Sequence, residues 1–238
     1  MFLKDKKIQK VLIINIVFSL VVVICGNLFY NHIAVAKTIG SILFVVQCLV
    51  NIILGKVLFN KEKNVFVWIL LLAQIFACAG DIVLEINFAN GAIVFGVGHV
   101  LFLVAFYVLN KFSWKDLPFI LGLVVIVLLL LTLYPNFNFK GMKAVIYAYG
   151  VIISIMLGKA MSNCLSSLDK KVKYPILIGA LLFYLSDLFL LFYKFAAIDG
   201  FTRFLCLHLY YPANCVLAFC AFLSIYSKKT KIEKKADE

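Results

Sequence analysis

Three carboxyl groups lie where a charge is costly, inside long runs of apolar residues. Asp81, Glu85 and Asp187 interrupt such runs, whereas the remaining acidic residues fall between runs or near the ends of the chain. A carboxylate near the centre of a bilayer costs about 2.5–3.5 kcal/mol, so it usually faces a cavity or a polar partner. Two buried carboxyl groups in one cavity can act as a general acid and its ionised partner. Alternatively, they tie helices together as structural clamps.

Further polar side chains accompany these carboxyl groups at helical spacing. Gln74, Asp81 and Glu85 share one face of a helix, because they are seven and four residues apart. Tyr184 lies one turn before Asp187 on the same face of another helix. The remaining candidates from the apolar runs are Lys37, His99, His208, Tyr210 and Tyr211.

The elements that carry these residues are membrane-spanning helices. Of the 238 residues, 65% are apolar and only 14% are charged, and the mean hydropathy is +1.07. Soluble domains contain about 25% charged residues, so the composition excludes a water-soluble globular protein, a disordered chain and a disulfide scaffold. A bilayer core needs roughly 20 apolar residues per helix. Runs of this length cover residues 11–30, 35–58, 65–88, 92–110, 117–134, 142–161, 174–194 and 203–226.

The sequence therefore predicts an all-α fold, a polytopic membrane bundle of eight transmembrane helices that forms one domain over residues 1–226. A charged cytoplasmic tail without regular structure is expected at 227–238. The net charge of +12 comes from basic residues that gather in alternate connections, which is typical of cytoplasmic loops rather than of nucleic-acid binding. Both termini are accordingly predicted to be cytoplasmic. The opposite side carries only Lys37, Lys140, Lys143, Lys194 and Arg203.

Depth in the membrane brings the candidate residues to one level. In this orientation Asp81 and Asp187 lie roughly 24 and 20 Å from the cytoplasmic ends of their helices. His99 lies roughly 12 Å below the outer face, and His208 falls in the outer part of the last helix. Independent clamps would scatter in depth, so we expect one polar cavity in the outer half of the membrane.

The seven cysteines have no C-x-x-C spacing, and most lie within apolar runs, where cysteine behaves as a small apolar residue. They predict neither disulfides nor a metal site. The histidine positions form no convincing ligand set, so we expect no metal and no cofactor.

Two segments, 73–106 and 179–214, resemble the signature of the YhhN family of membrane proteins. The shared features are a Gly-Asp pair in one helix, a Gly-His pair in the next, and Ser-Asp and Tyr-Tyr pairs in the last two helices. These pairs are Gly80-Asp81, Gly98-His99, Ser186-Asp187 and Tyr210-Tyr211. Lys37 and Tyr149 stand where the family carries a lysine and a tyrosine. The resemblance extends over nearly the whole chain.

The best-known members of this family are lysoplasmalogenases, so the resemblance implies a membrane-embedded hydrolase. It would cleave the vinyl-ether bond of a lysophospholipid in the bilayer and release a fatty aldehyde and glycerophosphoethanolamine or glycerophosphocholine. In this interpretation Asp81 and Asp187 form the catalytic pair and Lys37 holds the lipid phosphate. Supporting or substrate-binding roles are expected for Gln74, Glu85, His99, Tyr149, Tyr184, His208, Tyr210 and Tyr211.

Other classes of function fit the same residues. Intramembrane acids also mark proton relays, which would make the chain a small proton-coupled transporter with access from both faces. A non-catalytic lipid-binding protein would use the aspartates only to tie helices together. An intramembrane aspartyl protease fits poorly, because the chain has no Pro-Ala-Leu motif. The compact chain, rich in Lys, Ile and Asn, favours a bacterial plasma membrane.

Overall fold

The computed structural model describes residues 6–59, 64–196, 198 and 200–236, and its only regular elements in these ranges are helices. By length and composition, all eight helices can cross a membrane. The prediction of an all-helical bundle with eight transmembrane helices is confirmed. The helices are α1 Lys6–Tyr30, α2 Ala34–Leu58, α3 Val65–Ile86, α4 Phe88–Leu109, α5 Asp116–Leu133, α6 Lys143–Asn163, α7 Lys170–Phe195 and α8 Phe201–Ala236.

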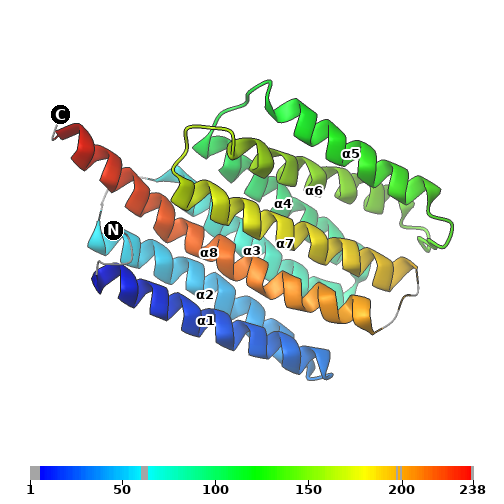
Figure 1. Cartoon of the computed structure of the whole chain (residues 1–238). Helices are drawn as coiled ribbons and strands as arrows, with labels where there is room; N and C mark the ends of the chain where they lie inside the picture. The colour runs from blue at the N-terminus through cyan, green and yellow to red at the C-terminus, as the bar shows by residue number, and fades with distance from the viewer. Residues whose placement is uncertain (1–5, 60–63, 197, 199, 237–238) are drawn as a thin grey trace.

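Helix α8 occupies the centre of the bundle. It packs against α1, α2, α3 and α7, and Figure 1 shows it running between α7 on one side and α1 with α2 on the other. Helix α4 joins α3 to α6, whereas α5 contacts only α6 among the described helices. Both termini lie at one end of the bundle (Figure 1). The turns that follow α1, α3, α5 and α7 therefore meet at the opposite end.

Capping side chains move two helix boundaries away from the positions that hydropathy predicts. The Asp169 side chain accepts a hydrogen bond from Lys171 N at 2.9 Å, so α7 begins at Lys170 rather than at 174. The Asn87 side chain accepts one from Asn90 N at 3.0 Å, and α4 begins directly after it. This one-residue connection holds the end of α3 against the start of α4.

The backbone of the charged tail is helical as far as Ala236. The prediction of an irregular tail is therefore wrong for residues 227–236. Lys, which is abundant there, has high helix propensity. Because α8 already supplies the helical nucleus, each further residue adds a backbone hydrogen bond without a new nucleation step.

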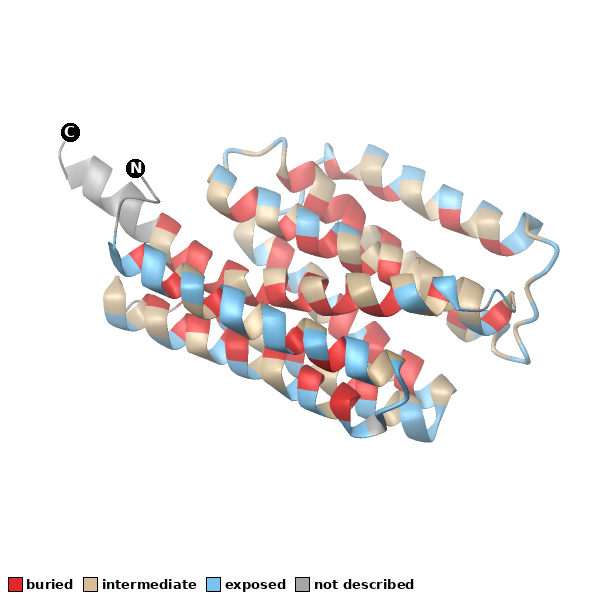
Figure 2. Cartoon of the chain, turned by 60° about the horizontal axis from the view of Figure 1, so that its bottom comes forward, coloured by how far each residue is buried: buried red, intermediate tan, exposed pale blue. Residues whose placement is uncertain are grey.

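Apolar side chains cover the outside of the bundle. On α1, Ile13, Val17, Leu20 and Ile24 are each more than half exposed. Figure 2 shows exposed positions recurring beside buried ones along the helices. An apolar surface of this extent is unfavourable in water and suits the hydrocarbon of a bilayer. The molecule is a multi-pass membrane protein.

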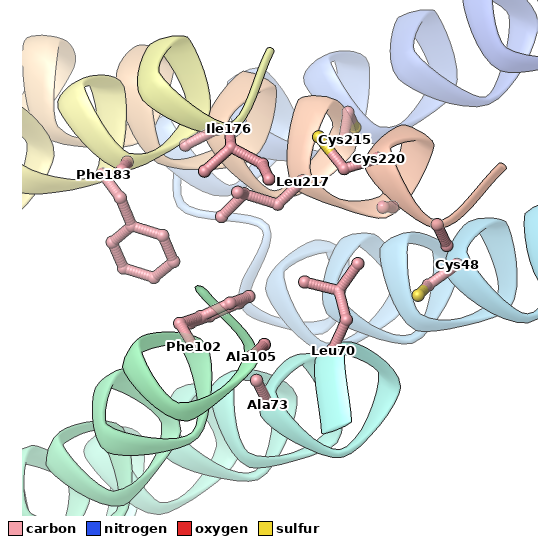
Figure 3. Close-up of a cluster of buried hydrophobic side chains, with 14 of the residues drawn as sticks. Cys48, Leu70, Ala73, Phe102, Ala105, Ile176, Phe183, Cys215, Leu217 and Cys220 are labelled. Carbon is pink, nitrogen blue, oxygen red and sulfur yellow. The ribbon is translucent and has the colours of Figure 1, made fainter. Parts of the chain in front are cut away.

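Small residues on α8 let the neighbouring helices approach it closely. Ala213, Ala218 and Ala221 are fully buried. At Gly179 of α7 an added Cβ would lie only 2.7 Å from Leu217 Cγ, so this contact requires glycine. Close packing through small residues is a common way for membrane helices to associate. Figure 3 shows the resulting core, in which side chains of α2, α3, α4, α7 and α8 converge.

A buried amide cluster fastens α1 to α2 and α8. Asn15 Nδ2 donates to Asn51 Oδ1 at 2.8 Å, and Gln47 Nε2 donates to Asn15 Oδ1 at 2.9 Å. Asn51 Nδ2 also donates to Ala218 O at 3.2 Å. An unsatisfied polar group in hydrocarbon is costly, so these bonds fix how α1 and α2 are rotated toward α8.

A buried ion pair holds α5 to α6. Lys159 Nζ lies 2.9 Å from Asp116 Oδ2, and both side chains are fully buried. Ser162 Oγ donates to Asp116 Oδ1, and Lys159 Nζ donates to Lys111 O at 3.1 Å. Each charge therefore has hydrogen-bond partners. Because both charges are buried, the loss of one would leave the other without its counter-ion in the interior of the protein.

We expect Lys159→Met to lower the free energy of unfolding by about 3 kcal/mol, because Asp116 would lose its counter-ion while remaining buried. The thermal unfolding midpoint of the detergent-solubilised protein measures the change. The matched control is Lys115→Met, since Lys115 is exposed and forms no ion pair within the described chain. Equal midpoints for both variants would show that the pair contributes nothing to stability.

Candidate active site

A cavity of about 470 Å³ lies in the half of the bundle that is remote from the termini. Its size is typical of small-molecule sites in proteins. Part of its wall is apolar and includes Val127, Leu131, Ile146 and Leu191. The polar part of the lining consists of His32, Lys37, Asp81, Glu85, Tyr149, Tyr184, Ser186, Asp187, Lys194, Arg203 and Tyr210.

Asp81 of α3 is held by side chains from two other helices. Tyr210 Oη of α8 donates to Asp81 Oδ2 at 2.6 Å, and Ser41 Oγ of α2 donates to the same oxygen at 2.5 Å. Lys37 Nζ lies 3.7 Å from Asp81 Oδ1. The Asp81 residue is only 4% exposed. The two donors and the nearby cation favour the carboxylate form of this side chain, whereas its burial favours the neutral acid.

Lys37 lies between two carboxyl groups. Its Nζ is 2.6 Å from Glu85 Oε1, in addition to its approach to Asp81. The Lys37 side chain is 9% exposed, whereas that of Glu85 is 51% exposed. The charge of Lys37 is therefore taken up by the protein itself, which leaves it poorly placed to bind a phosphate as the sequence predicted.

Asp187 of α7 belongs to a second hydrogen-bonded group. Tyr149 Oη of α6 donates to Asp187 Oδ2 at 2.7 Å, and His99 Nε2 of α4 lies 3.2 Å from the same oxygen. His99 Nε2 is also 2.8 Å from Tyr149 Oη. Side chains of α4 and α6 thus meet at this carboxyl group of α7. The Asp187 side chain remains 11% exposed and lines the cavity.

Aromatic rings separate the two aspartates. Tyr210, which holds Asp81, packs edge-to-face on Phe183 with the ring centroids 5.3 Å apart. Phe183 in turn packs on His99, at 4.7 Å between centroids. Within the described chain, no hydrogen bond joins the two carboxyl groups directly. Each aspartate therefore has its own environment while both line the same cavity.

Four of the site residues predicted from the sequence do not line the cavity. Gln74 is buried and donates to Asn214 O at 3.0 Å. His99 is buried and contacts Asp187 without lining the cavity itself. His208 stacks on Phe204 of its own helix, with 3.9 Å between the ring centroids. The ring of Tyr211 fills the space above Gly26, where an added Cβ would lie 2.3 Å from it. Helical spacing therefore did not show which of these side chains face the cavity.

Ser41, which holds Asp81, and three residues of the cavity lining were not predicted from the sequence as site residues. Ser41 lies one helical turn after Lys37, and that spacing is the signal that would have found it. Lys194 and Arg203 were treated only as charges on one side of the membrane. His32 lies in the turn between α1 and α2, with a positive φ of 69°. These four residues are spread over the sequence and share no motif.

The sequence model of the YhhN family matches residues 34–221, more than half of the chain. The chain belongs to the YhhN family. This match includes α2–α7 and most of α8, whereas α1 precedes it. Comparisons with curated proteins and with solved structures find no match.

The cavity of this YhhN protein is suited to proton chemistry. It combines carboxyl, phenol and imidazole groups, which all transfer protons. Among the described residues, no three His, Cys, Asp or Glu side chains are grouped as metal ligands would be.

Gly80 lets Phe95 of α4 pack beside Asp81. An added Cβ at Gly80 would lie 2.5 Å from Phe95 Cδ2, so Gly80→Ala must displace this ring. We expect the unfolding free energy to fall by about 1–3 kcal/mol, measured by thermal unfolding in detergent. Gly122→Ala is the control, because nothing lies within 4 Å of its added Cβ. Its stability should be unchanged or higher, and a similar loss in both variants would contradict the packing argument.

Proposed function

We propose that this YhhN protein is a membrane-embedded hydrolase that cleaves the vinyl-ether bond of lysoplasmalogens. The observation that carries the proposal is that Asp81 and Asp187, from α3 and α7, line one cavity in different hydrogen-bonding environments. The YhhN family includes lysoplasmalogenases, which supports this assignment. The products are a fatty aldehyde and glycerophosphoethanolamine or glycerophosphocholine.

The cavity suits an amphipathic substrate. Its apolar wall, with Val127, Leu131 and Leu191, offers a surface for an alkyl chain, and its polar residues offer one for a headgroup. In a lysoplasmalogen the vinyl ether lies next to the glycerol, at the boundary between these two parts. In the orientation that the basic residues predict, with both termini cytoplasmic, this position falls in the outer half of the bilayer.

The reaction begins with a proton transfer to carbon. A carboxylic acid protonates the β-carbon of the vinyl ether, and the electrons of the C=C bond form the new C–H bond. The α-carbon and the ether oxygen then share the positive charge as an oxocarbenium ion. Water adds to the α-carbon and gives its proton to a carboxylate. The hemiacetal collapses to the aldehyde and the glycerol hydroxyl.

In this reaction one aspartate delivers the proton and the other, as a carboxylate, stabilises the cation. Lys37 and two hydroxyl donors hold Asp81, whereas Tyr149 and His99 hold Asp187. Glycosidases divide the same tasks between two carboxyl groups around an oxocarbenium-like transition state.

Tyr149 and His99 are positioning residues in this scheme. They orient Asp187 and connect α4, α6 and α7 at the point of reaction. The same bonds also fit a second hypothesis, in which the aspartates serve only to tie helices together. The unfolding midpoints of variants distinguish the two hypotheses, because a purely structural aspartate contributes to folding whereas a catalytic aspartate is dispensable for it.

Asp81→Asn and Asp187→Asn are each expected to lower aldehyde release from vinyl-ether lysophosphatidylethanolamine at least about 100-fold, because general acid–base groups contribute factors of this size. The assay uses detergent-purified protein, and the unfolding midpoint of each variant is recorded. The contrasting pair is His99→Gln, which should reduce kcat because His99 contacts Asp187, and His208→Gln, which should retain activity because its contacts are with Phe204 rather than with an aspartate.

Two results would contradict the hydrolase. Folded wild-type protein that releases no aldehyde from ethanolamine or choline substrates would reject the reaction. Asparagine variants that unfold at much lower temperature than the wild type would identify the aspartates as clamps, and transport or lipid binding would then become the leading functions.

Protonation at carbon incorporates hydrogen from the solvent into the product, so deuterium labelling can detect it. In D₂O the aldehyde should carry a single deuterium at the carbon next to the carbonyl, because the acid delivers one solvent-derived proton there. Immediate reduction of the aldehyde to the alcohol prevents later exchange, and mass spectrometry counts the label. An unlabelled aldehyde from the folded enzyme would exclude this mechanism and leave cleavage to a different chemistry.

A further inference from the structure

Two cations of the cavity lining form no ion pair with a carboxylate of the described residues. Lys194, in the last turn of α7, is exposed, and Arg203, in the first turn of α8, is half-buried. Both line the cavity, yet neither forms an ion pair with any residue that the structure describes. Arg203 Nη2 donates to Phe29 O at 3.3 Å. Among the described residues Glu85 attracts Lys194, but its close contact is with Lys37, so no carboxylate pairs directly with either cation.

The other lysine of the lining differs from these two. Lys37 is 2.6 Å from Glu85 and 3.7 Å from Asp81, so it is already surrounded by negative charge. A second anion beside Lys37 would meet repulsion from both carboxyl groups. An anionic ligand therefore finds its favourable position at Lys194 and Arg203.

Aromatic faces hold both cations in place. Arg203 Cζ lies 5.6 Å from the ring centroid of Phe29 and 5.4 Å from that of Tyr30. Lys194 Nζ lies 5.5 Å from the centroid of Phe88 and 5.1 Å from that of Tyr193. Contacts of this kind orient a cation without cancelling its charge. The N–H groups that do not face a ring can donate to a ligand.

We propose that Lys194 and Arg203 bind the phosphodiester of a lysophospholipid headgroup. This inference rests on the proposed function and assigns the phosphate to these two residues instead of Lys37. The guanidinium of Arg203 presents paired donors that match two phosphate oxygens, and the Lys194 ammonium adds a point charge. Because Arg203 lies in the first turn of α8, the helix dipole adds to the attraction.

The surroundings indicate that the anion is attached to an apolar chain. Phe88 and Leu191 line the same cavity as the two cations, and its wall continues along Val127 and Leu131 of α5. A soluble phosphate would leave this apolar wall without a ligand. A lysolipid fills both parts, and its phosphate at Lys194 and Arg203 sets how far the molecule enters. The headgroup contact thereby fixes the vinyl ether relative to Asp81 and Asp187.

Binding of an unreactive ligand tests this site without relying on catalysis. The ligands are a saturated alkyl-ether lysophosphatidylethanolamine and the matching alkyl glycerol ether, which lacks the phosphate. Lys194→Met and Arg203→Met should each raise the Kd of the phosphate-bearing ligand about tenfold. The Kd of the alkyl glycerol ether should change less than about twofold. Titration of the detergent-solubilised full chain measures both constants.

Two controls accompany these variants. Lys143→Met removes an exposed cation from the same end of the bundle, outside the cavity lining, and should leave both Kd values unchanged. Arg203→Lys retains the charge and should restore part of the affinity. Equal losses for both ligands, or no loss for either, would show that Lys194 and Arg203 are ordinary interfacial anchors and would overturn the proposal. Wild-type protein that binds neither ligand would overturn it as well.

Further outcomes separate the headgroup site from its alternatives. Displacement of the lysolipid by inorganic phosphate alone, at similar concentration, would assign the site to free phosphate and reject the lipid. Phosphate-dependent lysolipid binding without aldehyde release from the vinyl-ether substrate would reject the hydrolase while supporting the headgroup site. The two proposals can therefore fail separately.

Discussion

A polar side chain that is surrounded by hydrocarbon must find its hydrogen-bond partner inside the protein, and the arrangement of these helices depends on that requirement. Asn15 and Asn51 meet this condition by joining α1 to α2, and Asp116 and Lys159 meet it by joining α5 to α6. The helices are otherwise apolar and would pack in many orientations with similar energy. Polar contacts such as these favour one orientation over the others.

The cavity is the place where two carboxyl groups keep a free edge, and this suits it to chemistry. Asp81 and Asp187 are held by Tyr210 and Tyr149 on one side and face open space on the other. A carboxyl group that is fully enclosed by donors can only support the fold. One that keeps a free edge toward a cavity can also exchange a proton with a ligand, as the proposed hydrolysis requires.

Charge is distributed unevenly around this cavity. Lys37 lies beside Glu85 and Asp81, so this part of the cavity lining contains both positive and negative charge. Lys194 and Arg203 are bordered by aromatic rings instead of carboxylates. A lysolipid whose phosphate lies at these cations has its reactive bond directed toward the aspartates. Binding and reaction then depend on different residues of one cavity.

The sequence by itself determined the eight helices, because each apolar run is long enough to span a bilayer and ends at polar residues. It also singled out Asp81 and Asp187, since carboxylates are rare in such runs. Only the tertiary structure decided which neighbours reach them. Tyr210 and Tyr211 are adjacent in the chain, yet successive residues point about 100° apart on a helix. The rotation that packing imposes on α8 directs Tyr210 to Asp81 and Tyr211 to Gly26.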